Sequence, residues 1–427
     1  MRTHLEHRAA TAALLAPLIE HLADPAVAEV IRVGDARGRI LSTDIASPTS
    51  LPRFANSQMD GYAIRSADLA SASPDSPVRL TVGRTSAAGD PVGTMDAGEA
   101  APVMTGAAVP LGADAVVPIE RADPPRFVGI GAGAHDAPMG TTVSFTAPVA
   151  PGTFVRDVGT DIAEGDVLLR AGTRLGPAQL GSLSAAGVVD VPVRPQARVL
   201  VLSTGHELRD PGIAFDPVRD SGAIYDANST MLAAAIAEAG AVAVTDAAPD
   251  DAAAVIDVLE AHPEADLVVT TGGVSAGAFE VVRDALAPLG VEFGPVAMQP
   301  GGPQGLGSAV LPGGRTVPVV AFPGNPVSAL VSFELFLRPV LRGLAGLPAH
   351  RPSQLAVLAH PVSSPPARHQ VRRGSLRADG AVEVGAPSSH LLHAYALANV
   401  LVHLPVGVDS LPAGAEVEIW RIDDGIT

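Results

Sequence analysis

Residues 199–207 read VLVLSTGHE, and this stretch decides the fold class of the region around it. Its first four residues form an unbroken apolar run, as expected for a strand that is covered on both faces. Beyond it the pattern alternates, with helices expected at 229–239, 251–261, 279–289 and 327–341 and strands at 241–245, 267–271 and 317–322. This alternation predicts a doubly wound α/β domain over residues 176–346. Asn228 or Ser229 is expected to cap the first helix.

The segments on either side of this domain have different patterns. Residues 1–26 place apolar side chains on one face of a helix, which we expect to pack on the α/β domain and to bend at Pro17. Residues 51–150 indicate a β-rich insertion, and residues 27–50 with 151–175 a linking β domain. Residues 350–427 predict a small β-barrel, with strands at 355–359, 381–384, 399–404 and 416–422.

Charge and composition exclude several classes of partner. The net charge is −17 and all 28 basic residues are arginine, so repulsion makes nucleic acid a poor partner. No apolar run approaches the roughly 18 residues that a bilayer span requires, and no membrane segment is expected. The absence of cysteine excludes disulfides and thiolate metal sites, and it fits a reducing, cytoplasmic compartment.

Three loops that follow expected strands are candidates for binding phosphate. Glycine lets backbone amides approach an anion closely, and hydroxyl groups add further donors. Because the carboxyl ends of parallel strands meet at one edge of a sheet, the loops are expected to converge there. Their candidate residues are Ser203, Thr204, Gly205, Gly272, Gly273, Ser275, Gly277, Pro323, Gly324, Asn325, Pro326 and Ser328. Each loop alone is better explained as a simple turn, and it is the occurrence of three at corresponding strand ends that favours binding.

Acidic residues are expected near the same edge of the sheet. They are Glu207, Asp220, Asp226, Asp250, Asp251 and Glu280. Mg²⁺ prefers a few carboxylates together with phosphate oxygens and water, so Glu207, Asp226 and Asp250 are its candidate ligands. Asp250 and Asp251 open a helix, and capping remains an alternative role for them.

The stretch LPRFANSQMDGYA at residues 51–63 points to a known family. It resembles the LPxFxNSxMDGYA stretch of MoeA-type molybdenum insertases, the family that includes the gephyrin E domain. Seven further stretches follow in that family's order, namely MTGA at 104–107, GADAVV at 112–117, AGT at 171–173, STG at 203–205, IYDAN at 224–228, GGVS at 272–275 and PGNPVS at 323–328. Eight ordered matches identify the chain as a member of this family.

The resemblance implies an elongated, multi-domain α/β plus β fold and a role in molybdenum cofactor biosynthesis. The implied reaction is the Mg²⁺-dependent cleavage of adenylylated molybdopterin to release AMP, with molybdate inserted into the dithiolene. It also implies a homodimer in which Asp60 and Thr105 complete the partner's site beside Glu207, Asp226, Asp250 and Glu280. A molybdopterin adenylyltransferase and apo-molybdoenzymes are the implied protein partners.

One departure from the family pattern affects the anion site. Residues 298–303 read MQPGGP where the family reads KPGKP, so Gln299 and Gly302 replace two lysines. We expect an arginine-based replacement, supplied by Arg368, Arg372 or Arg373, with loop amides at Gly301 and a hydroxyl at Ser389. Two alternatives remain open: a catalytically weakened paralogue that still binds molybdopterin, and a molybdopterin adenylyltransferase.

Overall fold

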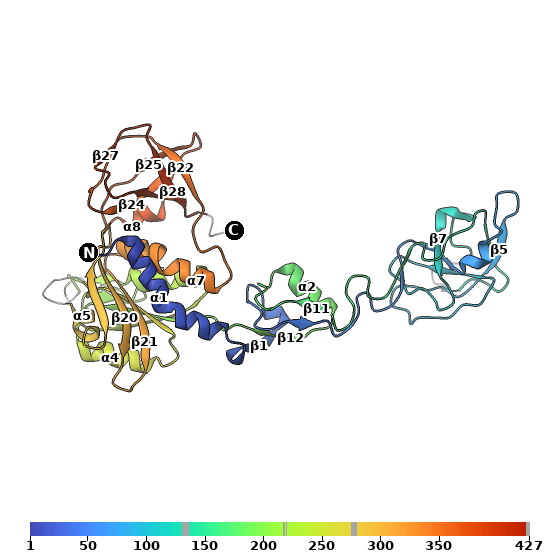
Figure 1. Ribbon diagram of the computed structural model, residues 1–427, viewed down its shortest axis with the longest axis horizontal. Coiled ribbons are helices and arrows are strands. Elements are labelled where there is room, and N and C mark those ends of the chain that lie inside the picture. The colour runs from blue at the N-terminus through green and yellow to red at the C-terminus, as the bar shows by residue number, and fades with distance from the viewer. Residues whose placement is uncertain (130–135, 217, 219, 275–279, 424–427) are drawn as a thin grey trace. The chain divides into compact units, whose positions relative to one another are not determined.

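The computed structural model describes residues 1–129, 136–216, 218, 220–274 and 280–423. The chain forms two compact units (Figure 1). The first contains Met1–Glu29, Gly38–Ser42 and Pro192–Thr427, and the second contains Val30–Arg37 and Thr43–Val191. The first unit resumes at Pro192 rather than at the expected residue 176, because α2 (Pro177–Ala185) contacts β11 (Val167–Leu169) of the second unit.

A six-stranded sheet forms the centre of the first unit, in the order β16-β13-β17-β21-β20-β18. The parallel strands are β13 (Arg198–Thr204), β16 (Val242–Ala248), β17 (Leu267–Thr271) and β21 (Thr316–Phe322). β20 (Pro303–Val310) and β18 (Val291–Pro295) run antiparallel to their neighbours. Val199 and Val201 belong to one hydrophobic core, and Leu200 and Leu202 to another. Because strand side chains alternate, the apolar run fills a core on each face of the sheet.

Helices cover both faces of this sheet. They are α1 (His4–Ala23), α3 (Ala227–Glu238), α4 (Ala252–Ala261), α5 (Val281–Leu286), α6 (Pro326–Ser332) and α7 (Arg338–Leu344). Leu15 and Leu22 place α1 in the same core as α3, as the sequence predicted, and α1 continues through Pro17. The expected cap of α3 was wrong, because Asp226 precedes the helix and its carboxylate accepts the Ser229 N–H.

The helix expected at 327–341 is divided by a π-helical segment, Phe333–Leu337, between α6 and α7. Pro339 accounts for the interruption. It has no N–H to donate four residues back, so the regular α-helical ladder cannot continue through this point.

The C-terminal strands close into a barrel, shown in red and orange in Figure 1. They are β22 (Ser353–Leu358), β24 (His369–Leu376), β25 (Ala381–Val384), β26 (Val400–Leu404) and β28 (Glu416–Arg421). The pairings run β24-β25-β22-β28-β26 and return to β24. Gly380, at φ +83°, forms the turn before β25. β24 was missed because its buried stretch is rich in histidine, glutamine and arginine.

The second unit contains a six-stranded sheet in the order β7-β4-β6-β5-β9-β8. Its strands are β4 (Gly61–Ile64), β5 (Val78–Val82), β6 (Glu99–Val103), β7 (Ala115–Pro118), β8 (Ala122–Asp123) and β9 (Thr142–Phe145). Gly61 is required here, because a Cβ atom would lie 2.1 Å from the Val117 carbonyl oxygen. Tyr62 is fully buried, and its hydroxyl donates to Arg126 O at 3.0 Å and accepts from Val128 N at 2.8 Å.

Shorter elements complete the two units. They are β1 (Glu29–Arg32), β2 (Ile45–Ala46), β3 (Asn56–Ser57), β10 (Val155–Arg156), β12 (Asp190–Val193), β14 (Leu208–Arg209), β15 (Ile224–Tyr225), β19 (Met298–Gln299), β23 (Val362–Ser363), β27 (Ser410–Leu411) and α8 (Leu392–Ala396). None of the described helices is both long and apolar enough to cross a membrane.

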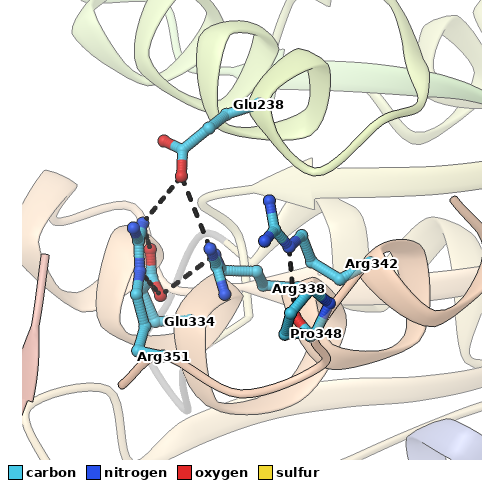
Figure 2. Close-up of polar contacts among 6 residues, drawn as sticks. All are labelled: Glu238, Glu334, Arg338, Arg342, Pro348 and Arg351. Atoms are coloured by element: carbon cyan, nitrogen blue, oxygen red, sulfur yellow. Dashed lines mark hydrogen bonds and ion pairs between the residues drawn. The ribbon is translucent and has the colours of Figure 1, made fainter. Parts of the chain in front are cut away.

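A buried ion network joins four segments of the first unit (Figure 2). Arg351 donates to both carboxylate oxygens of Glu334, at 3.0 and 2.8 Å, and lies 3.1 Å from Glu238. Arg338 lies 3.6 Å from Glu334 and 3.5 Å from Glu238. Glu334, Arg338 and Arg351 are at most 8% exposed. The network therefore connects the end of α3, the π-helical segment, α7 and the segment that leads into the barrel.

Four histidines gather where α1 meets the barrel. His4 stacks on His369 at 3.9 Å, and His369 Nε2 lies 3.0 Å from His403 Nδ1. His7 packs edge-on against Phe336. Burial is the main cause that lowers the pKa of His7 and of His369 to about 4, so both are neutral in the folded protein at pH 7.

This cluster predicts that the first unit loses stability in mild acid. Below the ordinary histidine pKa of about 6.5 the unfolded chain binds protons that folded His7 excludes, so stability falls as the pH decreases toward 4. Between pH 7.5 and 5 the loss should be roughly 2 kcal/mol for each of His7 and His369. Urea unfolding of His7→Leu should show a correspondingly smaller loss than wild type. The exposed His393→Gln is the control, and an unchanged acid sensitivity in His7→Leu would contradict the assignment.

Candidate functional site

The three glycine-containing loops converge on one cleft of about 760 Å³ in the first unit. They follow the carboxyl ends of β13, β17 and β21, which are neighbouring parallel strands. The side facing the barrel contributes Gln299, Gly301, Pro387 and Ser389. The predicted residues that line it are Thr204, Gly205, Glu207, Asp226, Asp250, Gly272, Gly273, Glu280, Pro323, Gly324, Asn325, Pro326 and Ser328. Convergence at strand ends explains why residues so distant in sequence meet.

Glycine is needed where two of the loops touch. Gly272 and Gly273 have φ values of +91° and +60°, which only glycine adopts without strain. A Cβ atom on Gly324 would lie 3.2 Å from Gly272 Cα, so the second and third loops are in close contact. Asn228 strengthens the junction by donating to Gly324 O at 2.8 Å, a role that the sequence analysis missed.

Not every predicted loop residue lines the cleft. Ser203 is fully buried, and its hydroxyl contacts those of Ser229 at 2.9 Å and Thr271 at 3.2 Å. It supports the loops rather than facing a ligand. Ser275 and Gly277 lie outside the described residues.

The predicted acids divide into two groups. Glu207, Asp226, Asp250 and Glu280 line the cleft. Asp220 instead lies 3.5 Å from Arg209, and Asp251 caps α4 by accepting the Ala253 N–H at 2.8 Å. Asp226 both lines the cleft and caps α3. Its carboxylate accepts from the Ser229 N–H at 3.1 Å and from the Ser229 hydroxyl at 2.5 Å.

The described residues contain no group of three acids or histidines close enough together to hold a metal ion by themselves. The expected ligands Glu207, Asp226 and Asp250 therefore share a cleft without forming a closed protein cage. Asp250 is already engaged, since its Oδ2 accepts from His206 N at 3.0 Å. A cation here would need oxygen atoms from a bound ligand as well.

The predicted pair Asp60 and Thr105 belongs to the second unit. Asp60 Oδ1 accepts from Thr105 N at 2.6 Å and from its hydroxyl at 2.8 Å. These two hydrogen bonds lower the pKa of Asp60, which keeps the exposed carboxylate ionised. The structure thus brings together two residues that lie 45 positions apart in the sequence.

No arginine is among the residues described as lining the cleft, which corrects the expectation for Arg368, Arg372 and Arg373. Arg368 is exposed on the segment before β24. Arg373 is 2% exposed and donates to Ser388 O at 2.8 Å and Ala386 O at 2.9 Å. Arg372 donates to Gly385 O. Arg372 and Arg373 hold the loop that carries Ser389 into the cleft, because their donors are directed at its carbonyl groups.

Comparison with known proteins covers both units. Residues 4–187 match the MoeA N-terminal region (domain I and II), 200–343 a probable molybdopterin binding domain, and 355–422 the MoeA C-terminal region (domain IV). Molybdopterin molybdenumtransferase 2 of Mycobacterium tuberculosis is 43% identical over 400 residues, which are 91% of this chain and 93% of that protein. The chain belongs to the MoeA family.

Other family members agree with this assignment. Molybdopterin molybdenumtransferase 1 of the same organism is 34% identical over 422 residues, with 91% of this chain and 93% of that protein covered. A solved structure of a molybdopterin biosynthesis MoeA protein from Pyrococcus horikosii is 31% identical. Its TM-score is 0.76, and the match covers 96% of this chain and 98% of that one. The resemblance read from the sequence is confirmed.

Two aspartates allow capping to be separated from ligand binding. Asp226→Asn keeps an oxygen that can accept the Ser229 N–H, so it should change the free energy of unfolding by less than about 0.5 kcal/mol while it lowers activity. Asp251→Ala removes a cap outside the cleft and should cost about 1 kcal/mol without lowering activity. Denaturant unfolding and AMP release measure the two effects. An Asp226→Asn protein with normal turnover would show that Asp226 is only a cap.

Proposed function

We propose that this cleft binds adenylylated molybdopterin, releases AMP and transfers molybdenum from molybdate to the dithiolene sulfurs. As a MoeA-family protein, the chain is a molybdopterin molybdenumtransferase, an enzyme of molybdenum cofactor biosynthesis. The observation that supports the finer proposal is the convergence of three glycine loops, four acids and Ser389 on one cleft. Glycine loops and hydroxyl groups bind phosphate, and the neighbouring acids favour a cation between themselves and the phosphate.

The phosphate end of the substrate fits the loops at the sheet edge. Thr204 lines the cleft, and its buried hydroxyl has no hydrogen-bond partner among the described residues. Gly272, Gly273 and Gly324 allow a close approach of the ligand, because no side chain projects from them. We assign the pyrophosphate to this part of the cleft.

The donor set fits Mg²⁺ bound jointly by protein and substrate. Glu207, Asp226 and Asp250 supply carboxylate oxygens, and the missing ligands would be phosphate oxygens and water, as Mg²⁺ prefers. Once bound, the ion would offset negative charge on the phosphates as the bond to AMP breaks. The chain's own contribution is to orient these oxygens, through the bonds from Ser229 to Asp226 and from His206 to Asp250.

The molybdate end of the site is assigned to the barrel side of the cleft. Ser389 offers a hydroxyl there, and Gln299 and Gly301 line the same cleft. The neutral character of Gln299 and Gly302 also favours a second candidate function, a weakened paralogue that binds molybdopterin but turns over slowly. Single-turnover incubation with adenylylated molybdopterin and molybdate separates the two by the rate at which molybdenum cofactor forms, since a weakened paralogue binds the substrate but converts it slowly.

Removal of divalent cations should abolish AMP release. Without a cation, the acids and the phosphates repel each other, and each unit charge about 4 Å away is worth roughly 4 kcal/mol at an effective dielectric of 20. AMP release is measured by chromatography after EDTA treatment and again after Mg²⁺ is restored. An EDTA-treated enzyme that releases AMP at the untreated rate would refute the cation role.

We also propose a homodimer in which Asp60 and Thr105 of one chain complete the partner's cleft. Both residues are exposed, and Asp60 is held as an anion although it belongs to the unit without the cleft. Each variant, Asp60→Ala or Glu207→Ala, should be inactive alone. Random exchange of their subunits should restore about a quarter of the sites, since half of the dimers are mixed and each mixed dimer has one intact site. No recovery despite demonstrated exchange would count against shared sites.

A further inference from the structure

A buried glutamine contacts the loop that replaces the family lysines. Gln370 is 2% exposed, and its Nε2 donates to Gln299 Oε1 at 2.8 Å. The two side chains meet because β19 and β24 pair in parallel with Gln299 opposite Gln370. Gln299 lines the cleft, whereas Gln370 does not.

A second buried glutamine also donates a hydrogen bond to this loop, two residues after Gln299. Gln304 is 1% exposed, and its Nε2 donates to Gly301 O at 2.7 Å. The same nitrogen lies 2.7 Å from Ser332 Oγ, which donates to Ser328 O at 2.7 Å. Gly301, like Gln299, lines the cleft.

Both glutamines use their NH₂ group and leave Oε1 buried without a partner among the described residues. The opposite amide orientation would bury an unpaired NH₂ group with two donors, and unpaired donors are tolerated less well than unpaired carbonyl oxygens. The same arrangement occurs twice on one loop, although Gln304 and Gln370 come from different strands.

We propose that Gln370 and Gln304 are positioning residues that turn the 299–303 loop into a neutral hydrogen-bond donor for a tetrahedral oxyanion. Gln370 occupies the only acceptor of the Gln299 side chain, so the Gln299 NH₂ group is left for the ligand. Gln304 binds the Gly301 carbonyl and so keeps it from turning toward an anion in the cleft. This inference rests on the proposed function, which places molybdate on this side of the cleft.

The arrangement offers a physical answer to the missing lysines. An oxyanion beside acidic residues requires donors, and an amide NH₂ provides them without adding a charge that the acids could neutralise. A carboxamide that is not held in place can, however, rotate and direct its oxygen toward the anion instead of its NH₂ group. Anchoring that oxygen removes the unfavourable rotamer before the ligand arrives.

Calorimetry with molybdate and with AMP as separate probes tests the proposal. Gln370→Met keeps the length of the side chain but cannot donate, and it should weaken molybdate binding about three- to fivefold. Gln370→Glu places an acceptor against Gln299, turns its oxygen toward the cleft, and should weaken binding about tenfold or more. AMP affinity should stay within about twofold of wild type in both. Gln196→Met, which removes a similar bond to Gly240 O at 3.0 Å, is the matched control and should change neither affinity.

A double-mutant cycle shows whether Gln370 acts through Gln299. In a Gln299→Leu background, Gln370→Met should have no further effect on molybdate binding, because the amide that it positions is gone. Thermal unfolding checks that Gln370→Glu still folds. If it does not fold, the molybdate affinity of Gln370→Met alone tests the positioning role. Equal losses in both backgrounds, or a loss of AMP affinity alongside molybdate affinity, would overturn the positioning role. Wild type that binds AMP but no molybdate also overturns it, whereas binding of neither probe overturns the proposed function as well.

Discussion

The bidentate ion pair between Glu334 and Arg351 is the interaction on which the rest of the first unit depends. It is buried, and its extension to Arg338 and Glu238 links α3 and the divided helix to the segment that enters the barrel. Loss of one partner would leave a buried charge unpaired, which typically costs about 3–5 kcal/mol. Since the cleft takes residues from both the sheet edge and the barrel side, its geometry requires these segments to hold their positions.

The charge of the cleft opposes the binding of its proposed substrates. Its described lining contains four carboxylates and no arginine or lysine, yet its proposed substrates are anions. Two arginines, Arg372 and Arg373, lie nearby, but they donate hydrogen bonds to carbonyl groups of the loop before Ser389. In the proposed function, anion binding therefore depends on backbone amides, hydroxyl groups and one anchored carboxamide. Such neutral donors must be well oriented, because no net charge compensates for a poor geometry.

Much of the fold and part of the site could be predicted from local pattern. The apolar run at 199–202, the strands at 267–271 and 317–322 and most of the helices were predicted correctly, because strand and helix periodicities are local properties. β24 was not predicted, since its buried arginines and its histidine hydrogen-bond to partners that lie 9–34 positions away in the chain. The Asp226 cap was missed because Asp, Asn and Ser are equally good caps, and only the backbone path selects among them.

The sequence alone determined the family, the three loops and the loss of the two lysines, because these are properties of residue identity and order. Only the tertiary structure decided which way each polar group is directed. Arg373 was expected to contact an anion but holds a loop, and Gln370 and Gln304 were not expected to matter at all. The reason is physical: a hydrogen bond depends on distance and direction between groups far apart in the chain, and neither quantity exists until the chain has folded.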